Sequence, residues 1–128
     1  MSVLLDSVIL IDHLNGITAA SQYLRRVPDG RISLITRAEV LSGPSVPNSP
    51  LLMQWLDRFQ ELPLDREAAD LAAELRRKYR WRLPDAFQAA LAQLHEVKLA
   101  TRDTRDFPPD RFSFVTVPYT LKSSKVTL

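Results

Sequence analysis

Short apolar runs recur along the chain between longer stretches in which apolar residues have helical spacing. The runs at 2–5, 32–35, 97–101 and 112–117 predict buried strands, since polar or turn-forming residues bound each of them. The apolar run at 7–14 fits a helix or a turn, because so short a run does not separate the two states. The pattern therefore predicts strands that are widely spaced in the sequence.

Helices are predicted between these strands. Apolar spacing favours helices over 19–26 and 51–62. The T-x-x-E pattern that begins at Thr36 predicts a capping box, which opens a third helix directly after the second strand. Three prolines within residues 44–50 predict a loop that ends this helix.

Two further helices precede the strand at 97–101. Asp65 is placed to cap the first, which runs to Tyr79, and Pro84 fits the first turn of the second. Strands that alternate with helices predict an α/β fold of three layers, with a mostly parallel central sheet covered on both faces. In such sheets, ligands bind where the carboxyl ends of the strands meet.

Acidic residues stand at the predicted strand ends or at the helix starts that follow them. Asp6 follows the first strand, Glu39 lies four residues after the second, and Asp85 begins a helix. Asp103 and Asp106 follow the third strand. Each also has a structural explanation: helix caps, a capping box, the helix dipole or a turn. Their common place at one edge of the sheet favours a functional site.

The chemistry of such a site follows from its ligands. Carboxylates gathered in one place repel one another unless a cation lies between them. Oxygen ligands without nearby cysteine or histidine suit Mg²⁺ or Mn²⁺. These ions activate water and neutralise charge on a phosphate, so a phosphodiester is the natural substrate. The chain has no cysteine, which excludes thiolate zinc sites and disulfides and fits a reducing compartment.

Four blocks of sequence contain these acids: LLDSVILID at 4–12, TRAEVLSG at 36–43, RLPDAFQAALA at 82–92 and LATRDTRDF at 99–107. In order and spacing they resemble the D-[ST]-x-x-x-I-D, T-x-x-E, P-D-A and T-R-[ND]-x-x-D-F motifs of the PIN-domain ribonucleases. Within that family they resemble the VapC-type toxins of bacterial toxin–antitoxin modules. The resemblance implies a PIN domain over 1–118. It leaves 119–128 as a tail, in which Lys122 and Lys125 are candidate RNA contacts.

The resemblance implies a role for each site residue. Asp6, Glu39, Asp85 and Asp103 match the catalytic, metal-binding acids of the family. Many relatives carry Asn at the position of Asp103, which leaves open whether Asp103 or Asp106 is the fourth metal ligand. Ser7 matches a hydroxyl position that can orient a carboxylate or a substrate phosphate, and Thr36 matches a hydroxyl with a positioning role. Arg82 and Arg102 lie within three residues of a site acid, so they are candidates to bind RNA phosphates, although each also fits an ion pair with a neighbouring carboxylate.

The same resemblance implies an endoribonuclease toxin in which Mg²⁺ or Mn²⁺ activates water to cleave RNA, with a transfer RNA or ribosomal RNA loop as the target. It also implies a cognate antitoxin, and either a homodimer or a toxin–antitoxin hetero-oligomer. A groove for the antitoxin is expected between 8–26 and 51–62. The apolar residues Leu52, Trp55, Leu56 and Phe59 are candidates there, but they also fit ordinary core packing.

Charge and hydropathy refine this picture. Seventeen Lys and Arg against fifteen Asp and Glu give a net charge of +2. Without the four site acids the balance is 17 − 11 = +6, so we expect a basic surface around one acidic pocket.

No apolar stretch is long enough for a membrane span, and the first residues lack the basic region of a signal peptide. These features predict a cytoplasmic protein.

Other functions compete with this interpretation. A catalytically weak PIN-like module that binds RNA or a partner would lack some of the acids, whereas this chain keeps them all. A phosphatase with Asp6 as nucleophile would need a second acid two residues later, where Val8 stands. The three glycines form no G-x-G-x-x-G motif, which argues against a dinucleotide-binding fold.

Overall fold

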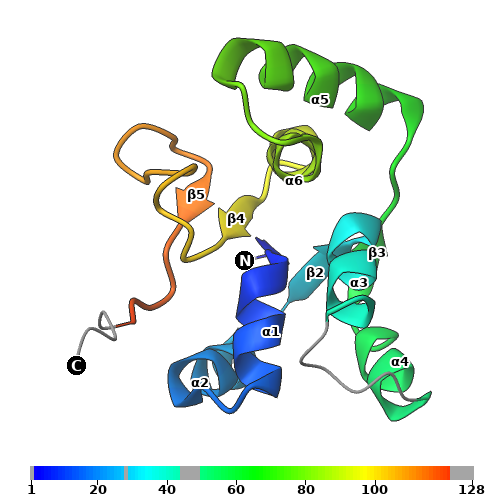
Figure 1. Ribbon diagram of the computed structural model, residues 1–128, viewed down its shortest axis with the longest axis vertical. Coiled ribbons are helices and arrows are strands. Elements are labelled where there is room, and N and C mark those ends of the chain that lie inside the picture. Colours follow the sequence, from blue (N-terminus) through cyan, green and yellow to red (C-terminus); the bar gives the residue numbers. More distant parts are fainter. Residues whose placement is uncertain (1, 28, 44–49, 122–128) are drawn as a thin grey trace.

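A computed structural model describes residues 2–27, 29–43 and 50–121 of the protein (Figure 1). Most of the proline-rich loop and the tail lysines Lys122 and Lys125 lie outside these residues. A five-stranded sheet occupies the centre, with every described pair of neighbours parallel and the order β3-β2-β1-β4-β5. The strands are β1 (Val3–Leu5), β2 (Gly30–Ser33), β3 (Gln60–Leu62), β4 (Lys98–Ala100) and β5 (Val115–Thr116).

Helices cover both faces of the sheet, which confirms the predicted α/β fold. They are α1 (Ser7–Leu14), α2 (Thr18–Arg26), α3 (Leu34–Leu41), α4 (Pro50–Leu56), α5 (Arg66–Tyr79) and α6 (Leu83–Leu94). In Figure 1, α5 and α6 lie on one side of the strands and α1 to α4 on the other. Among the described residues, no helix is long and apolar enough to cross a membrane.

The alternation of side chains along β1 explains the two core layers. Leu4 belongs to the cluster beneath α5 and α6, whereas Val3 and Leu5 belong to the cluster beneath α1, α2 and α4. Successive strand residues point to opposite faces, so a central strand buried on both sides must be apolar at every position. All three residues of β1 are buried, and the chain turns polar at Asp6, where the strand ends.

The boundary between β2 and α3 differs from the prediction. The apolar run at 32–35 does not form one strand, because α3 begins at Leu34. Ser33 caps this helix, and its hydroxyl accepts a hydrogen bond from the backbone N–H of Thr36 at 3.0 Å. Thr36 therefore lies inside the helix, and the predicted capping box at Thr36 is wrong. A short apolar run fits either a strand or a helix, and the Ser33 cap makes residues from Leu34 onward helical.

The predicted helix at 51–62 is also wrong in its second half. The helix α4 ends at Leu56, and residues 60–62 form the edge strand β3 beside β2. Pairing with β2 is a tertiary effect that the helical spacing of this short segment does not reveal. The last strand, β5, is restricted to Val115–Thr116 of the predicted 112–117.

Candidate active site

Asp6 lies at the centre of the candidate site, at the point where β1 ends and α1 begins. It is the N-cap of α1, and its Oδ1 accepts a hydrogen bond from the backbone N–H of Ser7 at 2.9 Å. Its Oδ2 accepts a second bond from the Thr101 hydroxyl at 2.7 Å, from the residue that follows β4. The carboxylate is thus fixed between two neighbouring strand ends.

A buried amide provides the third contact of Asp6. Gln88 of α6 is 1% exposed, and its Nε2 donates to Asp6 Oδ1 at 3.2 Å and to Thr36 Oγ1 at 2.8 Å. Its Oε1 accepts a bond from the Ser33 hydroxyl at 2.7 Å. The network therefore connects β1, β2, α3 and α6 beneath the site, and every one of its polar side chains has a partner.

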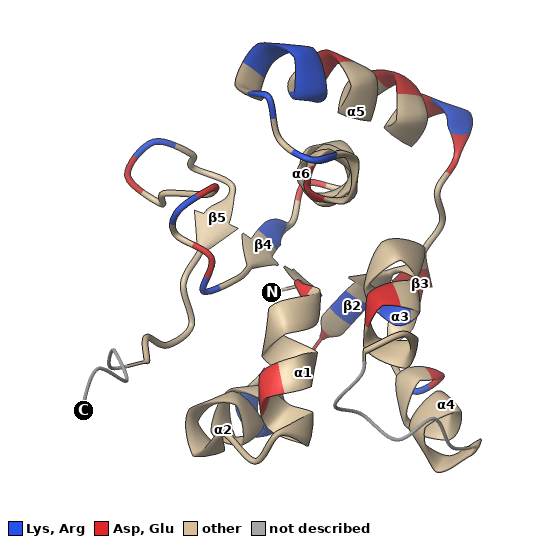
Figure 2. Ribbon diagram, in the orientation of Figure 1, with Lys and Arg blue, Asp and Glu red and all other residues tan. Residues whose placement is uncertain are grey.

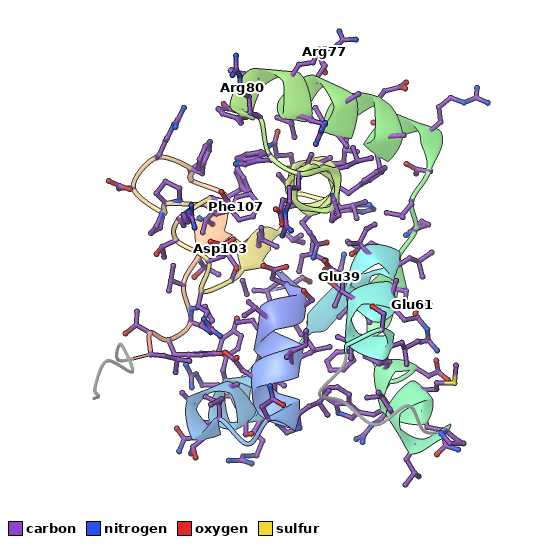
Figure 3. The ribbon with its side chains drawn as sticks, in the orientation of Figure 1. Glu39, Glu61, Arg77, Arg80, Asp103 and Phe107 are labelled. Carbon is purple, nitrogen blue, oxygen red and sulfur yellow. The ribbon has the colours of Figure 1, made fainter. Side chains whose placement is uncertain are left out.

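A cavity of about 410 Å³ opens above this network, and we call it the acid pocket. Figure 3 shows two of its residues, Glu39 on α3 and Asp103 after β4, on either side of the start of α1. The lining residues are Asp6, Ser7, Val8, Glu39, Arg82, Asp85, Arg102, Asp103, Thr104 and Arg105. The ends of β1 and β4, together with α3 and the start of α6, thus bring together four acids that are far apart in the sequence.

Asp85 and Glu39 of the pocket resist ionisation. The pKa of Asp85 is raised to about 6, mainly by burial and next by the negative charge of Asp6, with smaller contributions from Asp106 and Asp103 and against the opposing effect of Arg82. Burial also raises the pKa of Glu39, and the neighbouring Asp6 adds to the rise. Burial is the main cause of these shifts, and the mutual repulsion of the acids adds to them, so a cation bound among the acids would favour their ionised forms.

Burial also raises the pKa of Asp6, although its hydrogen bonds oppose the shift. Thr101 has the largest opposing effect and Gln88 the next, and the charge of Asp103 adds to the rise. The donors around Asp6 thus stabilise a charge that burial makes costly.

The ligand atoms available in the pocket suit a hard divalent cation, because all four acids offer carboxylate oxygens. Within residues 2–27, 29–43 and 50–121, however, no three carboxylate or histidine groups already meet in a ready-made metal cluster. The acids instead line the pocket from different elements. An ion held by three of them therefore requires some of these side chains to move.

The structure separates the two candidates for the fourth acid. Asp103 lines the acid pocket, and its Oδ1 accepts a hydrogen bond from the backbone N–H of Asp106 at 3.3 Å. Asp106 lines a neighbouring cavity instead, although its charge still acts on Asp85. The geometry therefore favours Asp103 as the acid that faces the pocket.

Of the four residues expected to contact the substrate, three line the acid pocket and one is buried beneath it. Ser7 and Arg82 line the pocket, with Arg82 3.6 Å from Asp85 and its side chain 83% exposed. Thr36 is completely buried, and its hydroxyl bonds to Gln88 and to the Leu5 carbonyl, so we do not retain it as a substrate contact. Arg102 lines the pocket but is paired with Asp12 on α1, through Nε at 2.5 Å and Nη2 at 2.8 Å.

Comparison with known proteins identifies the family. The sequence matches the PIN domain over residues 3–109, which include all five candidate acids. It is also 31% identical over 114 residues to Ribonuclease VapC10 of Mycobacterium tuberculosis, with 83% of this chain and 86% of the relative covered. The chain belongs to the PIN-domain family, in its VapC branch.

Solved structures resemble this PIN domain closely. A toxin–antitoxin complex from Klebsiella pneumoniae contains a chain that is 36% identical, with a TM-score of 0.85 over 93% of this chain and 99% of that one. FitAcB from Neisseria gonorrhoeae is 26% identical, with a TM-score of 0.70 over 91% of this chain and 97% of that one. The resemblance extends over nearly the whole of each chain.

Two polar residues of this PIN domain escaped the sequence analysis. Gln88 stands three residues after Asp85 in α6, so the two share one side of the helix, and that spacing was the available signal. Thr101 directly precedes Arg102 at the end of β4. Neither type of residue stands out in a sequence, because amides and hydroxyls are common at surface positions.

Proposed function

We propose that this PIN domain is a divalent-metal-dependent endoribonuclease and the toxin of a toxin–antitoxin pair. The observation that carries the proposal is the acid pocket, in which Asp6, Glu39, Asp85 and Asp103 gather from four separate segments. The names of its relatives support it, since one is called a ribonuclease and others are toxin–antitoxin complexes. An RNA substrate is also consistent with the expected cytoplasmic location.

In this proposal Asp6, Glu39, Asp85 and Asp103 hold Mg²⁺ or Mn²⁺. Such an ion, when bound, activates water for attack on phosphorus and offsets the charge that develops on the phosphate. Gln88 and Thr101 keep the Asp6 carboxylate oriented, because their hydrogen bonds leave it little freedom to rotate. Arg82 is exposed at the rim, and its charge attracts RNA phosphates toward the pocket although it also pairs with Asp85.

The decisive experiment measures cleavage of RNA by the purified chain, free of any partner. We expect cleavage with Mg²⁺ or Mn²⁺ and none with EDTA. The Asp85→Asn variant should lose activity by a factor of 100 or more, roughly the loss expected when a charged metal or transition-state contact is removed. Asp70→Asn, at an exposed position of α5, is the matched control and should cleave like the unmodified chain.

The same experiment also tests the alternative function, a catalytically weak module that binds RNA or a partner. Tight RNA binding without metal-dependent cleavage would favour that alternative and contradict the enzyme. Asp6→Asn is a second test, but it also perturbs the buried network, so its circular dichroism and melting temperature must accompany the activity. Equal cleavage by both Asp→Asn variants and the control would rule out the acid pocket as the site.

We infer that the antitoxin binds near a second cavity of about 580 Å³, whose lining includes His13, Leu24, Arg25, Trp55 and Phe59. This cavity lies among α1, α2 and α4, where the groove is expected. Leu52 and Leu56, also proposed for the groove, are buried in the core instead. The test is co-expression with candidate antitoxins, comparing Trp55→Ala with Leu51→Ala, a control that removes an exposed apolar side chain outside the cavity.

The oligomeric state stays a prediction. A homodimer or a toxin–antitoxin hetero-oligomer is expected from the family. Light scattering of the chain alone, and then with its antitoxin, distinguishes the two assemblies by mass. The target RNA is likewise expected to be a loop of transfer or ribosomal RNA, since single-stranded loops expose bases for recognition.

A further inference from the structure

A cavity distinct from the one proposed for the antitoxin opens beside the acid pocket, and we call it the basic cleft. It has a volume of about 300 Å³ and lies between the C-terminal end of α5 and the loop that connects β4 to β5. Figure 2 shows basic segments at this end of α5 and in that loop. Four of its lining side chains are cations: Lys78, Arg80, Arg105 and Arg111.

These cations are short of negative partners. Asp106 is the only acid among the residues that line the cleft, and among the described residues none of the four cations belongs to an ion pair. Like charges around one cavity repel each other, which costs stability unless an anion is bound there. The arrangement therefore suits an anionic ligand.

The helix dipole accounts for only part of this charge. Lys78 and Arg80 lie at the C-terminal end of α5, where cations are ordinarily stabilised. Arg105 and Arg111 come from the loop after β4, so the dipole of α5 does not explain their presence. Two segments far apart in the sequence supply cations to the same cleft.

Aromatic rings hold some of these cations in place. The Lys78 ammonium lies 5.2 Å from the centre of the Tyr79 ring, and the Arg111 guanidinium lies 5.4 Å from it. Arg111 also lies 5.1 Å from the Phe112 ring. Such contacts restrict the cations without neutralising them, so their charge stays available to a ligand.

The aromatic residues themselves are poorly placed to stack on bases. Trp81 is 6% exposed and Phe112 8% exposed, and Tyr79 is packed against Trp81 with 4.6 Å between ring centres. The cleft thus offers charge rather than open ring faces. Its chemistry matches backbone phosphates rather than nucleobases.

Arg105 connects the cleft to the proposed site. It lines both the acid pocket and the basic cleft, so the two cavities are adjacent across one side chain. We propose that the basic cleft binds backbone phosphates of the single-stranded RNA that continues beyond the acid pocket. This inference rests on the proposed ribonuclease function and assigns a second contact region to the same substrate.

The test measures RNA affinity by fluorescence anisotropy in EDTA, which prevents cleavage, with a twelve-nucleotide oligouridine at several salt concentrations. The cleft variant is Arg80→Gln with Arg111→Gln. The control, Arg66→Gln with Arg77→Gln, removes the same charge from exposed positions of α5 outside the cleft. Figure 3 shows Arg77 directed away from the body of the molecule.

We expect the dissociation constant of the cleft variant to rise severalfold more than that of the control. The slope of log affinity against log salt should become shallower by about 0.7 for each lost phosphate contact. Lys78→Gln with Arg80→Gln should reproduce the effect, and it serves as the test if loss of Arg111 impairs folding.

Equal affinities for the cleft and control variants would overturn the inference. So would wild-type RNA affinity together with loss of antitoxin binding, which would assign the cleft to a protein partner. Failure of the unmodified chain to cleave RNA with Mg²⁺ is a separate result. It would contradict the proposed function, whereas the anisotropy experiment reports on the cleft alone.

Discussion

At the residue scale, the acid pocket treats two of its carboxylates differently. Asp6 is almost fully buried, but three donors surround it: the Ser7 backbone, Thr101 and Gln88. Asp85 is less enclosed, and its ion-pair partner is the exposed Arg82 at 3.6 Å. Burial therefore makes ionisation costly at both carboxylates, and hydrogen bonds oppose this cost at Asp6.

This cost predicts how stability depends on pH. The folded-state pKa of Asp85 is about 6, above its ordinary value of 3.8, so the folded chain binds this proton more tightly than the unfolded chain. Ionisation of Asp85 therefore lowers the free energy of unfolding as the pH rises from about 4 to about 6. In EDTA, Asp85→Asn should raise the melting temperature at pH 7 and change it little at pH 4.

Thermal melts of Asp85→Asn and of the control Asp70→Asn at both pH values measure this effect. The same variant should lose cleavage, so stability and activity would move in opposite directions. A fall in melting temperature at pH 7, relative to the control, would contradict the proposed cost.

Gln88 predicts a different outcome, because its loss leaves buried groups without partners. Gln88→Met has a similar size but removes the donors to Asp6 and Thr36 and the acceptor for Ser33. We expect a loss of roughly 1–3 kcal/mol for each buried group left unsatisfied. Urea denaturation measures it, with Gln93→Met on the exposed side of α6 as the control. A loss below 0.5 kcal/mol, roughly the size of an ordinary surface substitution, would show that the network contributes little.

At the element scale, the start of α3 shows how a local cap determines the end of a strand. Ser33 is fully buried as the last residue of β2, and its hydroxyl also bonds to Gln88. One side chain therefore ends the strand, opens the helix and supports the site.

Replacing this cap should destabilise the protein. Ser33→Ala removes the N-cap bond to Thr36 and the bond to Gln88, so we expect a loss of about 1–3 kcal/mol, the sum of a typical cap and one buried hydrogen bond. Asp65→Ala, which removes only the exposed cap of α5, should cost about 1 kcal/mol. Chemical denaturation of both variants makes the comparison, and an equal cost would argue against the dual role of Ser33.

At the scale of the whole molecule, one buried carboxylate joins three distant segments. Asp12 of α1 accepts hydrogen bonds from Arg102, after β4, and from the Tyr119 hydroxyl at 2.8 Å. Burial alone would raise the pKa of Asp12, but these bonds and the guanidinium charge outweigh it and lower the pKa. Tyr119, the first residue of the expected tail, thus packs against the domain.

Tyr119→Phe tests this connection. The ring remains, but the hydroxyl bond to Asp12 is lost, so we expect the free energy of unfolding to fall by about 1–2 kcal/mol at pH 7. The deficit should shrink as acid protonates Asp12, because the lost bond is strongest to the ionised carboxylate. Denaturation at a series of pH values from 7 down to 2 measures it, because the lowered pKa of Asp12 places its protonation below pH 3.8. Tyr79→Phe serves as a control elsewhere. A deficit that stays constant over the whole series would contradict the role of the Asp12 charge.

The sequence alone determined the family, the α/β class and the acids that the structure places in the acid pocket. The α/β class and the candidate acids follow from apolar runs and from the acids near their ends, and the family follows from the resemblance of four motif blocks; all of these are local features. Asp6 is the clearest case, since a buried strand that turns polar at its last residue leaves that residue at the sheet edge.

Only the tertiary structure decided the rest. The edge strand β3 exists because β2 lies beside it, and Gln88 belongs to the site because α6 packs over α3. Asp103 rather than Asp106 faces the pocket because of the turn between them. The basic cleft likewise depends on two segments meeting in space. The periodicity of apolar residues shows which side of a helix or strand is buried, but not which other element covers that side. The edge strand, the place of Gln88 and the basic cleft all depend on which elements pack together.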